Sequence, residues 1–518
     1  MPQASPTSAI PKRLRRWLLV GLVTCLAAGL RLAGFIAQQA TTSGDLQSFT
    51  ERLDRDEARW RAAAEVHGAS VALVRNGGMV WSTGYGQADA ARGLPVTADT
   101  VFHMGSISKP VTAWGVMRLV EQGRLDLDVP VETYLTRWHL PASPFDSDGV
   151  TIRRLLSHSA GLSTQDYSYL SIRPLPSVEE SLAGDSGGAN ARSRPDDVRI
   201  TMQPGQQFNY SNGGFTILQL VIEEITGETF SAYMQREVLD PLGMSRSTFQ
   251  WRADMQASTA IEYDDAGEPM PNSLITERAA GGLYSTATDM ARFMASGMPG
   301  PEGEVPGRGV LMPETFYLMT AEFTLPDQKT VSLGYEVETL NGATGIGHGG
   351  SNTGTSTQFL TLPDRGEGIV VLSNSRDYAV TGVIMQAWGA WQGTGSSKIA
   401  VLLEQDLQSM VETFLIMAGL LTAGALGWAG YLLRGGFVGR RTWLWRPLAT
   451  RGTWTWIGRA SALAVTIAAA VTAWLVPWRD LIAAFIPTET HLLTLAVMLG
   501  CLAAAATALT RRTPTIAA

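Results

Sequence analysis

Three long apolar runs near the C-terminal end constrain this chain more than any other feature. They cover residues 414–433, 460–478 and 492–509, and each is about as long as a helix that crosses the hydrocarbon core of a bilayer. The runs lack a polar face and are flanked by charge, so buried helices of a soluble domain do not explain them. The sequence therefore predicts three transmembrane helices within residues 414–518, with a linker before them at 394–413.

Arginines in the connecting segments set the expected orientation of these helices. The loop at 434–459 carries six arginines and no acidic residue, and Arg511 and Arg512 follow the last run. The hairpin between the second and third runs contains Asp480 and Glu489 instead. By the positive-inside rule, the arginine-rich loop and the C-terminus lie in the cytoplasm.

Residues 1–44 also carry a membrane-targeting pattern. Four basic residues between positions 12 and 16 precede an apolar stretch at 17–30, which 32–37 extend beyond Arg31. The shorter stretch fits the core of a signal peptide, and the extended one could act as an uncleaved anchor. Either alternative exports residues 45–393. We therefore expect a multi-pass protein of the cell membrane with an extracytoplasmic domain.

Composition excludes several other classes of function. The net charge of -7 argues against binding to nucleic acid, which requires a basic face. The two cysteines, Cys25 and Cys501, both lie in apolar runs, so residues 45–393 contain neither a disulfide nor a cysteine nucleophile. The histidines fit no metal-ligand spacing. We expect no metal and no organic cofactor.

Strand patterns occur at both ends of the domain at 45–393. Apolar, β-prone runs at 71–74 and 79–83 are separated by Asn76-Gly77-Gly78, which is typical of a hairpin turn. A second pair lies at 355–362 and 368–374. With helices between the pairs, this order predicts one antiparallel sheet built from both ends of the domain. The Ser/Gly/Pro-rich stretch at 171–198 is expected to be a mobile surface insertion.

The tetrapeptide Ser106-Ile107-Ser108-Lys109 is the strongest chemical signal. Serine is a weak nucleophile until a base removes its proton, and a lysine three positions later lies on the same face of a helix. The chain has only four lysines, which makes a chance match less frequent. Pro110 is tolerated only near the start of a helix, so Ser106 is expected at a helix N-terminus, where backbone N–H groups can stabilise an oxyanion.

Further motifs follow this tetrapeptide in a fixed order. They are Leu155 to Leu162 (LLSHSAGL), Pro204-Gly205 before Tyr210-Ser211-Asn212, Pro241-Leu242-Gly243-Met244, Gly281-Gly282-Leu283, and Gly347 to Gly350. In this order the chain resembles the serine β-lactamase and penicillin-binding-protein-like hydrolase family, in its class C-like branch of esterases and D-amino-acid peptidases. The resemblance covers about residues 65–390. It implies an α/β (α+β) fold, with an antiparallel sheet flanked by helices and a helical subdomain.

The resemblance also implies roles for individual residues. Ser106 would be the acylated nucleophile, Lys109 its proton partner, and Tyr210 the general base and leaving-group acid. Asn212 would hydrogen-bond the substrate and Lys109. The backbone N–H groups of Ser106 and Ser351 would form the oxyanion hole.

His348, with Gly349 and Gly350, would bind the substrate, and here the chain departs from the family pattern. Penicillin-recognising members usually have a lysine at this position, which anchors a substrate carboxylate. Histidine, with an ordinary pKa of about 6.5, is mostly neutral at pH 7 and is a weaker anchor. The departure favours ester or neutral amide substrates. His158 is expected to be structural, with hydrogen bonds to local backbone.

These observations predict a membrane-bound serine hydrolase that cleaves small-molecule or peptide esters or amides through a Ser106 acyl-enzyme. A β-lactamase or DD-peptidase acting on cell-wall-like substrates is the alternative within the same class. A sensor or scaffold that accepts an acyl group without turnover is a third possibility, because three C-terminal spans exceed what an anchor requires. The lipid bilayer is the one other expected partner, and the sequence does not indicate an oligomeric state.

Overall fold

The computed structural model describes most of the domain between the predicted membrane segments. The described residues are 45–63, 66–165, 175–184, 197–264, 266–272, 274–340, 342–393, 441–443 and 510–512. Among them, no helix combines the length and the apolar character needed to cross a bilayer. The predicted membrane segments at 17–37, 414–433, 460–478 and 492–509 and the linker at 394–413 lie outside the described residues. The membrane topology therefore stays a prediction.

In the described part, a run of helices lies between strands at the two ends of the domain. The helices are α2 (Leu46–Ala63), α3 (Ser108–Glu121), α4 (Ile152–Leu156), α5 (Val178–Leu182), α6 (Asn212–Thr226), α7 (Phe230–Met234), α8 (Arg278–Gly281), α9 (Ala287–Ser296), α10 (Pro313–Thr320) and α11 (Ala379–Trp391). The longer strands are β1 (Gly68–Arg75), β2 (Gly78–Asp89), β10 (Glu336–Leu340), β11 (Ala343–Ser351), β12 (Ser356–Leu362) and β13 (Glu367–Ser373). Short strands are β3 (Leu94–Pro95), β4 (Phe102–His103), β5 (Glu262–Tyr263), β6 (Pro269–Met270), β7 (Tyr284–Ser285), β8 (Phe323–Thr324), β9 (Thr330–Val331), β14 (Arg441–Trp443) and β15 (Thr510–Arg512).

A seven-stranded sheet joins the two ends of the domain. Its order is β10-β11-β12-β13-β1-β2-β3, and every neighbouring pair is antiparallel. β1 pairs with β13 so that Val71 lies opposite Val371. Asn76 and Gly77 have φ angles of 50° and 65°, which the tight turn between β1 and β2 requires. The predicted hairpin and the predicted antiparallel sheet are confirmed.

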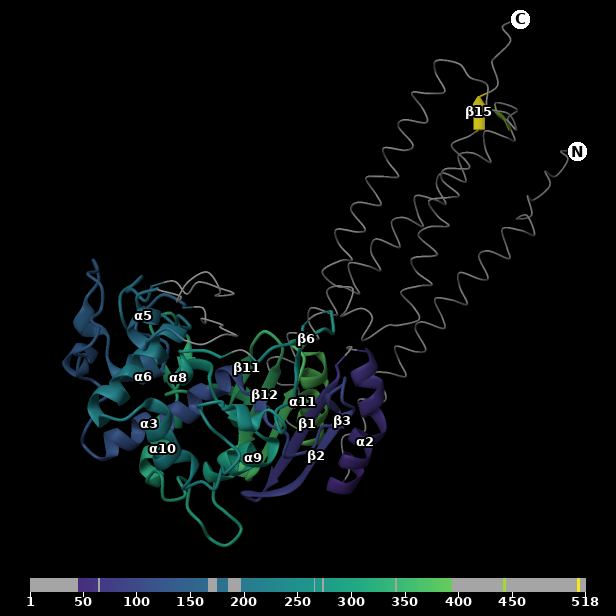
Figure 1. The fold of residues 1–518 in the computed structure, drawn as a ribbon, viewed down its shortest axis with the longest axis horizontal. Coiled ribbons are helices and arrows are strands. Elements are labelled where there is room, and N and C mark those ends of the chain that lie inside the picture. Colours follow the sequence, from purple (N-terminus) through teal and green to yellow (C-terminus); the bar gives the residue numbers. More distant parts are fainter. Residues whose placement is uncertain are drawn as a thin grey trace, which may run out of the picture.

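Two apolar cores lie on opposite faces of this sheet. Because side chains alternate along a strand, Val71 and Leu73 enter one core while Ala72 and Val74 enter the other. The smaller core packs against α2 and α11. The larger one packs against α9 and extends among α3, α6 and α8, which form a helical layer beside the sheet in Figure 1.

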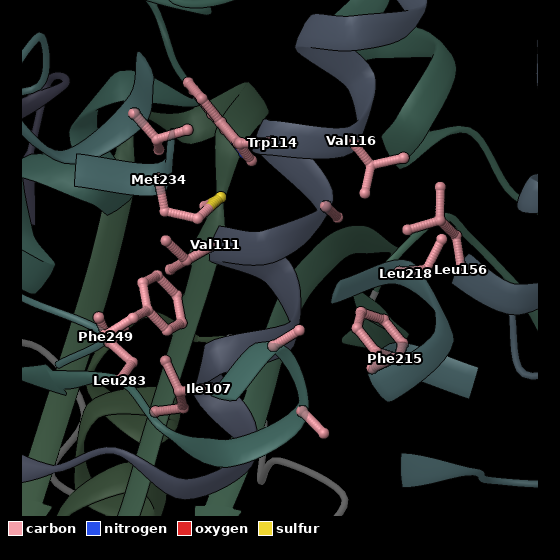
Figure 2. Close-up of a cluster of buried hydrophobic side chains, with 14 of the residues drawn as sticks. Ile107, Val111, Trp114, Val116, Leu156, Phe215, Leu218, Met234, Phe249 and Leu283 are labelled. Atoms are coloured by element: carbon pink, nitrogen blue, oxygen red, sulfur yellow. The ribbon is translucent and has the colours of Figure 1, made fainter. Parts of the chain in front are cut away.

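Helix α3 passes through the larger core, and Ser106 lies in the short segment directly before it. Ile107, Val111 and Trp114 are fully buried and lie along this segment in Figure 2, with Phe215 and Phe249 nearby. The Trp114 indole donates to the Tyr335 hydroxyl at 2.8 Å. A helix buried on nearly all sides fixes the segment that precedes it.

Two local predictions need correction. The stretch at 171–198 contains α5, whose Ser181 and Leu182 are buried, so this part is not a surface insertion. Residues 171–174 and 185–196 of the stretch lie outside the described part. The second predicted strand pair, at 355–362 and 368–374, omits β11, which contains His348, Gly349 and Gly350. The glycine-rich sequence of β11 has low strand propensity, and pairing with β10 and β12 imposes the extended backbone.

Candidate active site

Ser106 lies in a short 3-10 helix, Gly105–Ile107, that leads directly into α3. The position predicted for it, at a helix N-terminus, is confirmed. Gly105 has φ +53°, and a Cβ atom there would lie 2.7 Å from the backbone nitrogen of Ser351. Only glycine therefore allows this turn to approach the end of β11. The close approach brings the backbone of Ser351 beside the Ser106 segment.

Lys109 is fully buried one turn after Ser106. Its Nζ atom lies 3.0 Å from Ser106 Oγ and donates to the carbonyl of Ala280 in α8 at 2.8 Å. Burial lowers the pKa of Lys109 well below its usual range, and the charge of Glu336 offsets only part of this shift. A lysine with a lowered pKa can accept the serine proton as a neutral amine.

Tyr210 covers the lysine amine from the other side. Lys109 Nζ lies 4.7 Å from the centroid of the Tyr210 ring and 5.7 Å from that of Phe215. Ring faces attract a cation, whereas burial favours the neutral amine and lowers the pKa of Lys109. The structure thus brings together Ser106, Lys109 and Tyr210 from segments that are far apart in the sequence.

The N-terminus of α6 holds Tyr210 in place. Ser211 is the N-cap residue: its Oγ accepts the N–H of Gly214 at 3.1 Å and donates to the carbonyl of Ser163 at 2.6 Å. Asn212 is the first residue of α6, and its amide donates to the carbonyl of Gln165 at 2.7 Å. The roles predicted for Asn212, bonds to Lys109 and to substrate, stay predictions.

His158 has a larger part in the site than the sequence indicated. Its Nδ1 accepts the backbone N–H of Ser211 at 3.0 Å, and its ring stacks on Tyr210 with centroids 4.3 Å apart. The expectation of bonds to local backbone was therefore wrong for the ring, whose partner lies 53 residues away. Burial lowers the pKa of His158 well below its usual range, with smaller contributions from Lys109 and His348. The fixed order of motifs was the one available signal, since nothing local distinguishes this histidine.

His348, in β11, lies near the ring of Tyr210. Its ring centroid is 6.3 Å from that of Tyr210, and its Nδ1 donates to the carbonyl of Gly349 at 2.6 Å. Burial lowers its pKa, and Lys109 adds to that shift, while Glu336 opposes it. The neutral imidazole predicted from the sequence therefore fits its surroundings, and His348 supplies no fixed positive charge.

The end of β11 is held tightly against the Ser106 segment. A Cβ atom on Gly350 would lie 2.1 Å from the carbonyl oxygen of Met104, so no side chain fits there. Tyr378 Oη donates to the carbonyl of Gly350 at 2.9 Å, and Thr357 Oγ1 donates to that of Met104 at 2.8 Å. These contacts fix the backbone that carries the N–H of Ser351. Within the described residues, no group of three or more His, Cys, Asp or Glu side chains could hold a metal ion.

An antiparallel sheet with a helical layer, and a serine beside a buried lysine between them, are typical of one class of serine hydrolases. Comparison with family models agrees: the model described as "Beta-lactamase" matches residues 53–387. This match covers more than half of the sequence, and the chain belongs to the β-lactamase family of serine hydrolases.

Several individual proteins and solved structures are similar to this chain. Esterase EstB of Burkholderia gladioli is 32% identical over 239 residues, which cover 44% of this chain and 57% of the esterase. The structure of the octameric penicillin-binding protein homologue from Pyrococcus abyssi matches with a TM-score of 0.54 and 26% identity, covering 67% of this chain and 78% of that one. The structure of SurE with D-Leu matches with a TM-score of 0.51 and 25% identity, covering 67% and 74%. The chain spans between 52% and 60% of the length of several curated relatives that it matches.

Proposed function

We propose that this protein hydrolyses ester or amide bonds through an acyl-enzyme formed on Ser106. The observation that carries the proposal is the 3.0 Å separation between Ser106 Oγ and the amine of a fully buried lysine. A serine beside an ordinary solvated lysine would face an ammonium group, which cannot take a proton. Burial of Lys109 removes this obstacle.

Each step of the proposed reaction is assigned to a group of the candidate site. The neutral Lys109 amine takes the proton of Ser106, whose Oγ then attacks the carbonyl carbon of the substrate. The N–H groups of Ser106 and Ser351 stabilise the resulting oxyanion. Tyr210 passes the proton to the leaving alcohol or amine as the bond to the acyl carbon breaks. Water, deprotonated along the same route, then attacks the acyl-enzyme and releases the acid.

The surroundings of His348 support uncharged or weakly charged substrates. A fixed cation at this position would stabilise a substrate carboxylate, whereas a buried imidazole with a lowered pKa would not. The 32% sequence identity to esterase EstB over 239 residues also supports a preference for uncharged ester substrates. Cell-wall-like substrates with a free carboxylate, and β-lactams among them, form the alternative that the experiment below tests.

The experiment uses the full chain in detergent and its Ser106→Ala variant, with Ser48→Ala on the exposed face of α2 as the matched control. Each is given a short-chain p-nitrophenyl ester, a chromogenic cephalosporin and a D-alanyl amide. We expect ester turnover that Ser106→Ala abolishes and Ser48→Ala retains. Faster hydrolysis of the cephalosporin would favour the alternative substrates, and acylation without turnover would indicate a sensor. Full activity in Ser106→Ala would refute the site.

An extracytoplasmic position for this domain remains part of the proposal. It rests on the apolar runs and the arginine-rich loop of the sequence. Intact cells that produce the protein would be treated with a membrane-impermeant fluorophosphonate. Labelling of the parent protein but not of Ser106→Ala is expected, and labelling only after lysis would place the domain inside the cell.

A further inference from the structure

A buried polar cluster lies directly behind the proposed oxyanion hole. It consists of His103 from β4, Glu262 from β5, and Asn352, the residue after β11. Their exposed fractions are 2%, 2% and 5%. Polar groups buried this deeply are costly unless hydrogen bonds hold them, so their arrangement carries information about what they do.

The orientation of the Asn352 amide is fixed by its neighbours. Its Oδ1 accepts the backbone N–H groups of Gly354 and Thr355 at 2.9 and 2.8 Å. The Nδ2 group must therefore point the other way, where it contacts His103 Nδ1 and lies 3.2 Å from Glu262 Oε1. Because Nδ2 carries two hydrogens, it can donate to both.

The same contacts determine the form of His103. Its Nε2 lies 2.8 Å from the carbonyl oxygen of Gly281, which can only accept, so Nε2 carries the hydrogen. Nδ1 then accepts from Asn352, whose amide orientation its other bonds fix. Stacking on Tyr284, with centroids 4.7 Å apart, holds the plane of the ring.

One imidazole therefore connects both sides of the proposed site. Through Asn352 it holds the turn that follows Ser351, whose N–H belongs to the oxyanion hole. Through Gly281 it holds the end of α8, where the adjacent carbonyl of Ala280 accepts from Lys109. The backbone carbonyl of His103 also accepts from Thr355 Oγ1 at 3.0 Å.

We propose that His103 and Asn352 are positioning residues for this hydrolase, which set the oxyanion hole and the Lys109 acceptor at a fixed separation. The proposal rests on the proposed function, since it concerns the same reaction. Glu262 completes the arrangement by accepting the second Nδ2 hydrogen of Asn352. Both residues act through the backbone groups that they hydrogen-bond.

The first test replaces His103 by phenylalanine in the full chain, which keeps a ring for stacking on Tyr284 and removes both hydrogen bonds. His67→Phe is the matched control, because His67 stacks on Tyr263 in the same way, with centroids 3.7 Å apart. Complete loss of one oxyanion donor lowers kcat about 100- to 1000-fold, so a displaced donor should cost about 10-fold or more. Acylation and deacylation share the oxyanion hole, so we expect kcat to fall with KM little changed.

Three conservative variants separate the two contacts and cover a failure of His103→Phe to fold. His103→Gln can keep a donor for Gly281, and His103→Asn can keep an acceptor for Asn352, so each should recover part of the lost kcat. Asn352→Asp keeps the acceptor for the turn but faces Glu262 with a second carboxylate, and its kcat should fall like that of His103→Phe.

The outcomes distinguish this inference from the proposed function. If Ser106→Ala retains turnover, the function itself is wrong. If Ser106→Ala is inactive while folded His103 and Asn352 variants keep the kcat of the parent protein, only the positioning role is refuted. If the His103 and Asn352 variants lose thermal stability but keep the kcat of the parent protein, the cluster stabilises the fold and does not position the site.

Discussion

Lys109 is fully buried, and its amine contacts Ser106 Oγ and the carbonyl of Ala280. The pairing with Ser106 could be predicted from sequence because residues three apart share a helix face. The position of Tyr210 over the amine could not be worked out from spacing, and it was expected only through the family resemblance. The tertiary contacts of α6 and of His158 decide where that ring lies.

Replacement of Lys109 by methionine should separate chemistry from stability. Methionine fills a similar volume without a charge, so the fold should be retained and the melting temperature should not fall. Loss of the proton acceptor should lower ester turnover about 100- to 10,000-fold. Lys329→Met, at an exposed position, is the control and should keep full activity. Normal turnover in folded Lys109→Met would show that another group removes the serine proton.

The difference in the free energy of unfolding between the parent protein and Lys109→Met should also depend on pH. In the unfolded chain the pKa of Lys109 is near 10.5, and burial lowers it in the fold. Between the two values the unfolded state binds more protons, so the parent protein becomes more stable as pH rises through this window. The advantage of Lys109→Met should therefore be largest at low pH and shrink toward about pH 10.5. Urea denaturation at several pH values measures this, and a constant difference would contradict it.

At the scale of elements, β11 determines the shape of the site. Its glycines gave no strand signal in the sequence, yet they allow the strand to lie against the Ser106 segment without side chains between them. Strand propensity describes how well a residue suits an average strand. In β11, pairing with the neighbouring strands and the close approach to the Ser106 segment determine the backbone conformation instead. By contrast β1 and β2 follow an alternating pattern with a typical turn, and sequence alone predicted both.

Gly350→Ala should test this close approach. The new Cβ would overlap the carbonyl oxygen of Met104 at 2.1 Å, so β11 must move away from Ser106. Such overpacking costs about 1 to 3 kcal/mol, and the displaced Ser351 N–H should lower kcat as well. Gly78→Ala is the control, because the new Cβ would lie 3.5 Å from Pro301 Cγ, an ordinary contact. Unchanged kcat and melting temperature in Gly350→Ala would contradict the described packing.

At the scale of the whole molecule, the site exists only because distant segments meet. The β1–β13 pairing was predictable from strand patterns at the two ends of the domain. The helical layer between them was expected only in outline, because amphipathic periods do not say which helix faces which. Asn374 reinforces the junction: its Oδ1 accepts the N–H of Gly68 at 2.7 Å, and its Nδ2 donates to the carbonyl of Gln87 at 3.1 Å.

Asn374→Ala should weaken the junction without touching the chemistry. It leaves a buried N–H and a carbonyl without their partners, which should lower the free energy of unfolding by about 1 to 3 kcal/mol. The folded fraction should keep the kcat of the parent protein. Asn272→Ala, whose amide contacts the side chain of Gln256, should change stability by less than about 0.5 kcal/mol. A large loss of kcat in folded Asn374→Ala would mean that the junction also shapes the site.

The first and last helices of the domain lie side by side on the face of the sheet away from the site. Phe49 of α2 stacks on Trp391 of α11 with ring centroids 4.6 Å apart. The two ends are therefore close enough for a short peptide to join them, and a circular permutation could open the chain elsewhere. The places where the chain of this domain begins and ends can therefore change without changing the site, which lies on the other face of the sheet.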